Sequence, residues 1–210
     1  MPEGSLASAL LESRVIAVVR VDESEAILPT AHAIARGGVR LLEVALTSPG
    51  ALAAISRLAA ELPDALVGAG TVLNERGAEA AVEAGARFLF SPGFSADVLR
   101  VARARDVPYV PGALTPTEIM ELLELGIREI KIFPAGPAGP AYIRDLLGPF
   151  PELRAIPTGG VNGDNVRAFL RAGAVAVGVG GALAGERKDD YAGIERRTAD
   201  LMALVSERPG

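Results

Sequence analysis

The sequence predicts an α/β fold, and within that class a single-domain (β/α)8 TIM barrel with a short N-terminal helix over residues 1–210. Eight short apolar runs recur along the chain at spacings of roughly 20–26 residues, the period of a strand followed by a helix. Segments with helical apolar spacing lie between these runs, and a glycine follows several of them just before the next run. An open doubly wound sheet would fit the same alternation, but no G-x-G-x-x-G pattern follows the first run, so the barrel is favoured.

The eight runs are predicted to be parallel strands, because their nearly continuous apolar character is typical of strands buried on both faces. In chain order they are Val15–Arg20, Leu41–Leu46, Leu66–Gly70, Phe88–Pro92, Pro108–Ala113, Glu129–Phe133, Ala155–Gly160 and Ala176–Gly181.

The clearest helical patterns lie in the intervening segments and at the N-terminus, where Met1 to Arg14 predicts a short amphipathic helix. The patterns between strands are Ala31–Ala35, Ala78–Ala84, Val98–Ala104, Ile119–Leu125 and Val166–Ala172. Several polar residues are predicted to cap helices: Asn74, Ser95 and Asp164 as single caps, and Thr115 with Glu118 as a capping box.

Composition excludes several classes of function. The chain has no cysteine and one histidine, His32, which rules out disulfides, thiolate metal sites and histidine-cluster metal sites, and rules out a Ser-His-Asp triad unless His32 serves. We therefore expect no metal and no cofactor. A formal net charge of −5 and 4% aromatic residues argue against a nucleic-acid partner.

No apolar run approaches the roughly 20 residues of a membrane-spanning helix. The N-terminus lacks the basic and apolar regions of a secretory signal. We expect no membrane partner and a cytoplasmic location.

Two charged residues interrupt the apolar strands: Glu43 in LLEVAL and Lys131 in EIKIFP. A charge buried without a partner is costly. Lys131 is one of two lysines beside nineteen arginines, so its retention in a strand calls for a reason. One interpretation is structural, an interior ion pair with Glu43 or a lysine reaching out from the end of its strand.

The other interpretation of Lys131 is a nucleophile that forms a Schiff base. Burial disfavours the charged form of an amine, and only an unprotonated amine attacks a carbonyl, a role that arginine cannot take. Glu43 would then move protons to and from the intermediates, directly or through a water. This role is compatible with charge compensation.

Glycine pairs follow the last two predicted strands, at Gly159–Gly160 and Gly180–Gly181. Barrels frequently bind phosphate between these two loops, and unobstructed backbone amides favour an anion. Arg20, at the end of the first strand, is expected either to clamp a substrate carboxylate or to pair with a surface carboxylate. Thr71 is expected either to add a hydroxyl to the same anion or to cap its loop.

Together these segments resemble the 2-keto-3-deoxy-6-phosphogluconate (KDPG) aldolase family, which includes 4-hydroxy-2-oxoglutarate (KHG) and 2-keto-3-deoxy-6-phosphogalactonate aldolases. The resemblance runs from about Val15 to Leu183. The motifs that carry it are Gly37-Gly38-Val39, Leu42-Glu43-Val44, Gly68-Ala69-Gly70-Thr71, Ser91-Pro92-Gly93, Pro111-Gly112, Lys131-Ile132-Phe133-Pro134, Thr158-Gly159-Gly160 and Gly178-Val179-Gly180.

The resemblance implies a homotrimeric, metal-independent class I aldolase with a phosphorylated keto acid as its substrate. KDPG would be cleaved to pyruvate and glyceraldehyde 3-phosphate, with cleavage of KHG to pyruvate and glyoxylate as a second expected reaction and 2-keto-3-deoxy-6-phosphogalactonate as an alternative substrate. It implies that Lys131 forms the Schiff base and Glu43 is the general acid/base. Thr71 would contact the pyruvate carboxylate, Thr158 the imine and its water, and the glycine pairs the phosphate.

This chain departs from the family pattern at two positions. Many members carry arginine four residues after the glutamate, where this chain has Thr47. The carboxylate could be held by Arg20 or by Thr71 and backbone groups, and Thr47 is also expected in the substrate-binding region. A serine that is common after the last glycine pair is replaced by Ala182, which leaves phosphate to backbone donors. Two other functions stay open: an isomerase, epimerase or synthase on the same barrel, and a non-catalytic barrel that binds a phosphorylated metabolite.

Overall fold

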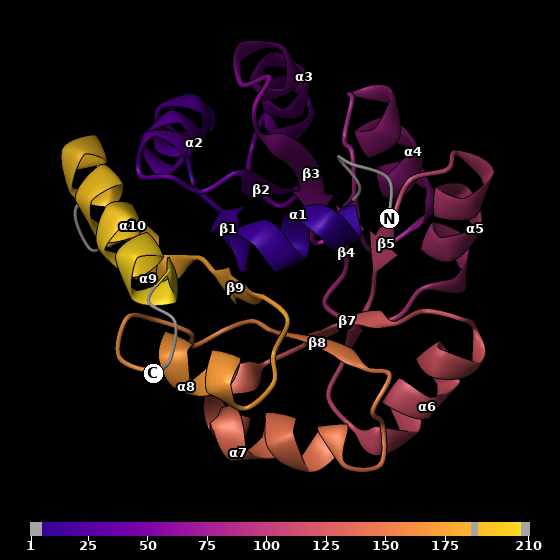
Figure 1. Ribbon diagram of the computed structural model, residues 1–210. Coiled ribbons are helices and arrows are strands. Elements are labelled where there is room, and N and C mark those ends of the chain that lie inside the picture. The colour runs from indigo at the N-terminus through magenta and orange to yellow at the C-terminus, as the bar shows by residue number, and fades with distance from the viewer. Residues whose placement is uncertain (1–5, 186–188, 207–210) are drawn as a thin grey trace.

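The computed structural model describes residues 6–185 and 189–206. Parallel strands lie around the centre of the molecule and helices surround them (Figure 1). The strands are β1 (Val15–Val19), β2 (Leu41–Ala45), β3 (Leu66–Gly70), β4 (Leu89–Phe90), β5 (Tyr109–Val110), β6 (Gly112–Ala113), β7 (Glu129–Ile132), β8 (Arg154–Pro157) and β9 (Val177–Val179). The helices are α1 (Leu6–Ser13), the 3-10 helix η1 (Ser24–Ala26), α2 (Ile27–Arg36), α3 (Ala51–Glu61), α4 (Glu75–Glu83), α5 (Ala96–Ala104), α6 (Pro116–Glu124), α7 (Ala135–Leu147), α8 (Val166–Arg171), α9 (Gly181–Ala184) and α10 (Tyr191–Ser206).

The strands form two hydrogen-bonded parallel sheets. The larger has the order β5-β4-β3-β2-β1-β9 and the smaller the order β6-β7-β8. A single bridge between Thr158 and Gly178 lies between the end of β8 and β9. The predicted α/β class, with a curled parallel sheet and helices between strands, is confirmed.

The fifth predicted strand, Pro108–Ala113, is divided in the structure. β5 and β6 each contain two residues, and Pro111 separates them. Proline has no N–H to donate to a ladder, so the chain passes from one sheet to the other at this residue. The Pro111 carbonyl still accepts a hydrogen bond of 2.9 Å from the Lys131 backbone N–H.

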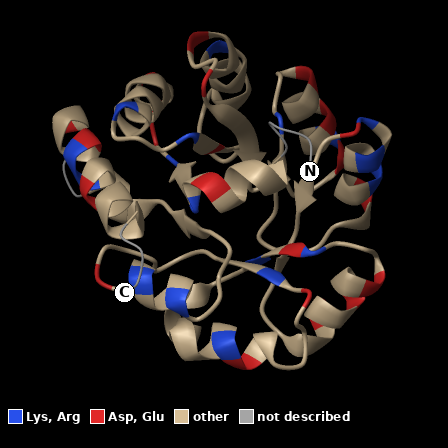
Figure 2. Cartoon of the chain, viewed as in Figure 1, with Lys and Arg blue, Asp and Glu red and all other residues tan. Residues whose placement is uncertain are grey.

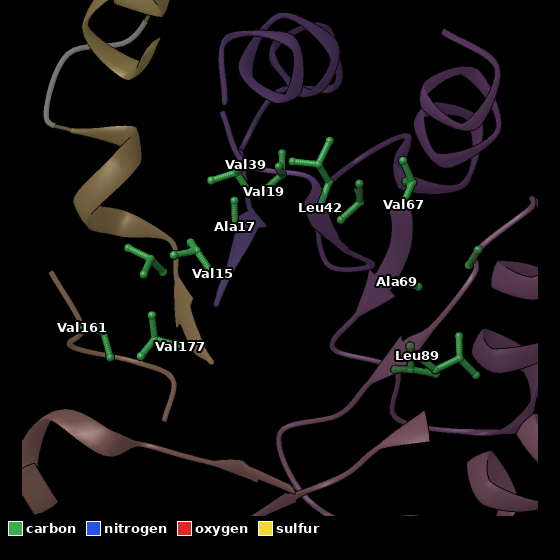
Figure 3. Packing of buried hydrophobic residues seen from close by; sticks show 14 of the residues in the cluster. Val15, Ala17, Val19, Val39, Leu42, Val67, Ala69, Leu89, Val161 and Val177 are labelled. Atoms are coloured by element: carbon green, nitrogen blue, oxygen red, sulfur yellow. The ribbon is translucent and has the colours of Figure 1, made fainter. Parts of the chain in front are cut away.

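Side chains alternate between two environments along each strand. Val15, Ala17 and Val19 of β1 belong to the large core between the strands and the helices (Figure 3). Ile16 instead packs in a second, smaller core with residues of other strands. This period of two decides which side chains of a strand point toward the centre.

Helix α1 contributes to the smaller core and lies across the ring of strands (Figure 1). Leu6 and Leu10 are buried there against Leu41 and Phe88, which lie at or before the amino ends of their strands. The predicted N-terminal helix is therefore present over Leu6–Ser13, and residues 1–5 lie outside the described range. The helix covers the amino ends of the strands and leaves the carboxyl ends free to form a site.

Several predicted caps are confirmed by the backbone contacts of the helices. The side chains of Asn74 and Ser95 accept hydrogen bonds from backbone N–H groups at the starts of α4 and α5, and Thr115 with Glu118 forms the capping box of α6. Asp164 is not a cap, because α8 begins at Val166 and Asn165 occupies the cap position without a side-chain cap bond.

Charged side chains lie along the outer helices (Figure 2). None of the helices within residues 6–185 and 189–206 combines the length and apolar character needed to cross a bilayer.

Candidate active site

Glu43 and Lys131 meet at the centre of the molecule. In β2, Leu42 and Val44 face the large core, and in β7, Ile130 and Ile132 do the same, so the residues between them point inward. Lys131 Nζ lies 3.4 Å from Glu43 Oε1. The two residues are 5% and 1% exposed, so this is an interior pair and Lys131 does not reach out to solvent from the end of its strand.

Aromatic rings complete the surroundings of Lys131 Nζ. Nζ lies 5.7 Å from the ring centroid of Phe90 and 5.6 Å from that of Phe133. The face of an aromatic ring attracts a cation at such distances. A cationic nitrogen at this position, whether an ammonium or an iminium, is thus stabilised by a carboxylate and two rings.

Two glycines provide the room that these side chains need. A Cβ at Gly70 of β3 would collide with the Glu43 carboxylate, and a Cβ at Gly178 of β9 would collide with the side chain of Thr158. Thr158 itself is 6% exposed and follows β8 directly. The small residues of β3 and β9 therefore leave space for polar groups in the interior.

A cavity of about 600 Å³ extends from Lys131 to the surface at the carboxyl ends of the strands. Its lining comprises Val18, Arg20, Thr30, Ile34, Lys131, Phe133, Thr158, Gly159, Gly160, Val161, Asn162, Gly178, Gly180, Gly181, Ala182 and Ala184. The cavity thus joins the buried amine to both predicted glycine pairs. Volumes of this order are typical of small-molecule sites.

The first glycine pair has a backbone that suits glycine alone. Gly159 and Gly160 have φ values of +84° and +80°, where a side chain would be strained. Asn165 holds this loop, because its Nδ2 donates to the Gly160 carbonyl at 2.8 Å and its Oδ1 accepts from the Asn162 N–H at 2.9 Å. Asn162 and Asn165 therefore shape the loop through hydrogen bonds to its backbone.

Arg20 and Thr71 form a contact at the rim of the site. Arg20 Nη2 donates to Thr71 Oγ1 at 2.8 Å, and Arg20 also lines the cavity. Thr71 has a φ of +56°, an unfavourable value for a β-branched residue. The next residue, Val72, is fixed on both sides: its N–H donates to the Phe90 carbonyl, and its carbonyl accepts from Ser91 Oγ. This anchoring keeps the Thr71 hydroxyl facing Arg20.

Thr47 lies elsewhere. It is exposed in the turn that follows β2, and it does not line the cavity. The neighbouring Ser48 is buried instead, and its Oγ accepts a hydrogen bond of 3.0 Å from the Val21 N–H. Among the substrate-binding residues expected from the sequence, Arg20 and Thr158 line the cavity, Thr71 contacts Arg20, and Thr47 stands apart.

Sequence reasoning missed the contributions of Phe90, Phe133, Gly70 and Ser91. An aromatic residue at or just after the end of a strand was the available signal for the two phenylalanines. Within the described residues, no group of three or more His, Cys, Asp or Glu side chains could hold a metal ion. His32 lies apart from the cavity, with its Nε2 2.8 Å from Glu61 Oε2.

Comparison with known proteins gives one consistent family. The family model for KDPG and KHG aldolase matches residues 6–197. The 2-dehydro-3-deoxy-phosphogluconate aldolase of Pseudomonas aeruginosa is 39% identical over 93% of this chain and 91% of its own length. The KHG/KDPG aldolase of Escherichia coli K12 is 40% identical over 79% of this chain and 78% of its own length.

A solved structure of a similar protein has the same fold. The KDPG aldolase of Legionella pneumophila, with pyruvate captured as a covalent carbinolamine intermediate, superposes with a TM-score of 0.80 at 34% identity, covering 94% of this chain and 95% of that one. The interior lysine–glutamate pair, the glycine loops and the family match agree, and the chain therefore belongs to the KDPG and KHG aldolase family.

Proposed function

We propose that this chain is a class I aldolase that cleaves KDPG to pyruvate and glyceraldehyde 3-phosphate through a Schiff base on Lys131. The observation that carries the proposal is the Lys131 Nζ to Glu43 Oε1 distance of 3.4 Å at the inner end of a cavity bordered by two glycine loops. The Legionella relative supports the chemistry, because its pyruvate is held as a carbinolamine.

The reaction begins when the Lys131 amine attacks the C2 carbonyl of the substrate. The carbinolamine loses water and becomes a protonated imine, which accepts the electron pair of the C3–C4 bond as that bond breaks. Glu43 takes the proton of the C4 hydroxyl, directly or through a water, and glyceraldehyde 3-phosphate leaves. Glu43 returns the proton to C3 of the enamine, and water then hydrolyses the pyruvate imine and frees Lys131.

In these reaction steps the iminium nitrogen is the electron sink, so we propose that the reaction needs no metal ion. Phe90 and Phe133 favour the cationic intermediate, because their rings lie 5.7 and 5.6 Å from Nζ. Turnover is expected to be unchanged after exhaustive treatment with a chelator.

The other residues of the site are assigned to the parts of the substrate that would lie beside them along the cavity. Arg20, supported by Thr71, holds the substrate carboxylate, and Thr158 contacts the imine and its water. Backbone N–H groups of Gly159, Gly160, Gly180 and Gly181 hold the phosphate at the other end. KHG, which has no phosphate, would use only the inner part of this site.

We further propose that the two sheets act as one closed (β/α)8 barrel, with the whole chain as one domain, and that the protein is a homotrimer. Two features support closure: the continuous chain through Pro111 and the bridge between Thr158 and Gly178. Sedimentation equilibrium tests the trimer, and a monomer at micromolar concentration would contradict it.

Trapping of the Schiff base tests the proposed reaction. Sodium borohydride added with pyruvate should reduce the imine and leave a stable adduct that peptide mass spectrometry locates at Lys131. The Lys131→Ala variant should form no adduct and should not release pyruvate from KDPG. An isomerase or epimerase would act on phosphorylated sugars without an adduct, and a binding module would gain thermal stability with KDPG and release no pyruvate.

A panel of three substrates then defines specificity. Initial rates of pyruvate release from KDPG, 2-keto-3-deoxy-6-phosphogalactonate and KHG compare the two C4 configurations and the absence of phosphate. We expect the highest kcat/KM with KDPG. A higher value with the galactonate would assign this chain to the alternative substrate while leaving the Schiff base in place.

A further inference from the structure

The short helix α9 supplies one wall of the cavity. Gly180, Gly181, Ala182 and Ala184 line the cavity, and α9 also packs against α10 (Figure 1). A single helical turn has little stability of its own. Its position must therefore be fixed by contacts made with the rest of the protein.

The free carbonyls at the end of α9 are bound by one side chain of α10. Arg197 Nε donates to the Leu183 carbonyl at 2.9 Å, and Nη2 donates to the Ala184 carbonyl at 2.9 Å. Both carbonyls belong to the last turn of the helix, where no intrahelical partner is available. The third nitrogen, Nη1, lies 3.2 Å from Asp190 Oδ2.

The backbone around the guanidinium group is shaped to admit it. A Cβ at Gly185 would collide with the Arg197 guanidinium, and Gly185 has a φ of +72°. A Cβ at Gly193 would collide first with the Asp190 carboxylate and then with the guanidinium. Asp190 is fixed in turn, because its Oδ1 accepts a hydrogen bond of 3.0 Å from the Gly193 N–H. The Arg197 hydrogen bond, followed by that of Gly193, lowers the pKa of Asp190, so the carboxylate stays charged beside the arginine at neutral pH.

We propose that Arg197 is a positioning residue for the phosphate end of the cavity: it holds α9 so that the backbone of Gly180–Ala182 faces the substrate phosphate. This inference rests on the proposed aldolase function and assigns Arg197 a part in specificity for phosphorylated substrates. Arg197 is not among the residues that line the cavity. It acts through the Leu183 and Ala184 carbonyls at the C-terminal end of α9, the helix whose first residues border the glycine loop.

Two reactions that both use Lys131 distinguish a positioning role of Arg197 from a general effect of Arg197 on the stability of the protein. Cleavage of KDPG needs the phosphate end, whereas exchange of the pyruvate methyl protons with deuterated solvent needs only the Schiff base and the general base. In Arg197→Ala we expect α9 to shift and one backbone hydrogen bond to the charged phosphate to be lost. This loss should raise the KM for KDPG by about tenfold. The KM for pyruvate in the exchange reaction should stay within a factor of two of the wild type.

The control is Arg196→Ala, which removes the same charge from the exposed neighbouring position on α10. It should leave both KM values unchanged. Arg197→Lys keeps the charge but loses the fork that reaches two carbonyls and Asp190, and it should raise the KM for KDPG in the same direction. If Arg197→Ala does not fold, Arg197→Lys supplies the measurement.

Three outcomes overturn the inference: an unchanged KM for KDPG, an equal rise in both KM values, or a loss of kcat alone. Each of these leaves the aldolase proposal intact if pyruvate still traps on Lys131 in the wild type. Absence of that adduct in the wild type would instead remove the proposed function itself.

Discussion

The Glu43 carboxylate occupies the space that a side chain at Gly70 would need. Gly70 lies on β3, beside the strand that carries Glu43, and a Cβ there would collide with Glu43 Oε1. The carboxylate in turn lies 3.4 Å from Lys131 Nζ. A missing side chain on one strand thus determines where the acid on the next strand can lie.

The Gly70→Ala variant is expected to push the Glu43 carboxylate away from Lys131. Because a displacement of about 1 Å in a catalytic group can lower a rate about 100-fold, we expect kcat for KDPG cleavage to fall by about that factor. The matched control is Gly93→Ala, since a Cβ at Gly93 would meet no atom within 4 Å. Wild-type kcat in Gly70→Ala would show that the carboxylate position is not critical.

Glu43→Gln preserves the shape of the side chain and removes its ability to accept a proton. The rate of pyruvate methyl-proton exchange, followed by NMR in deuterated water, is expected to fall by about 10²–10⁴-fold, the usual contribution of a general base. The borohydride adduct on Lys131 should still form, only more slowly.

Glu129→Gln is the control for Glu43→Gln, because Glu129 is a partly buried carboxylate on β7 that pairs with Arg154 at 2.7 Å. It should exchange protons at the wild-type rate. Exchange at the wild-type rate in Glu43→Gln itself would leave Glu43 with charge compensation as its only role.

Thr115→Ala is expected to weaken the start of α6. Thr115 Oγ1 accepts from the Glu118 N–H, and the Glu118 carboxylate accepts from the Leu114 and Thr115 N–H groups at 2.8 and 2.7 Å. Loss of an N-cap costs about 1 kcal/mol, which lowers Tm by about 2–4 °C in a chain of this size. Calorimetry should show no such change for Thr117→Ala, an exposed threonine two residues further on.

The same capping box predicts a pH dependence of stability. Hydrogen bonds from the backbone N–H groups of Leu114 and Thr115 lower the pKa of Glu118. Stability from this carboxylate is therefore present above the pKa of glutamate in the unfolded chain and is lost as the pH falls through the lowered folded value. Glu118→Gln lacks this contribution. Its Tm should therefore be lower than that of the wild type at pH 7, and the difference should shrink as the pH falls into the acid range.

The inward direction of Glu43 and Lys131 was predictable from sequence because strands alternate with a period of two. A charge flanked by Leu42 and Val44, or by Ile130 and Ile132, must face away from the core that these neighbours enter. The 3.4 Å distance was not predictable, since it depends on how two strands separated by 88 positions are arranged across the centre.

The division of the fifth strand shows a limit of apolar pattern alone. Tyr109–Val110 and Gly112–Ala113 read as one run, and the break depends on the absence of a single N–H at Pro111. The caps show a similar limit: Asp164 and Asn165 are both good capping residues, and sequence preference does not separate adjacent positions.

Contacts of high sequence separation were beyond the reach of local pattern. Arg20 was a candidate for the carboxylate because it ends the first strand, but its bond to Thr71 joins residues 51 positions apart. The sequence around Arg197 does not indicate its positioning role, because an arginine on the last helix is usually a solvated side chain. Its role depends on carbonyls of α9 and on two glycines that only the folded chain brings together.

Arg20→Ala tests which group holds the substrate carboxylate. Arg20 lines the cavity and is fixed by the hydroxyl of Thr71, so its removal is expected to raise the KM for pyruvate in the exchange reaction by about tenfold while changing kcat much less. Arg87→Ala, which removes an exposed arginine before β4, should leave the KM unchanged. An unchanged KM in Arg20→Ala together with a raised KM in Thr47→Ala would place the carboxylate at the turn after β2 instead.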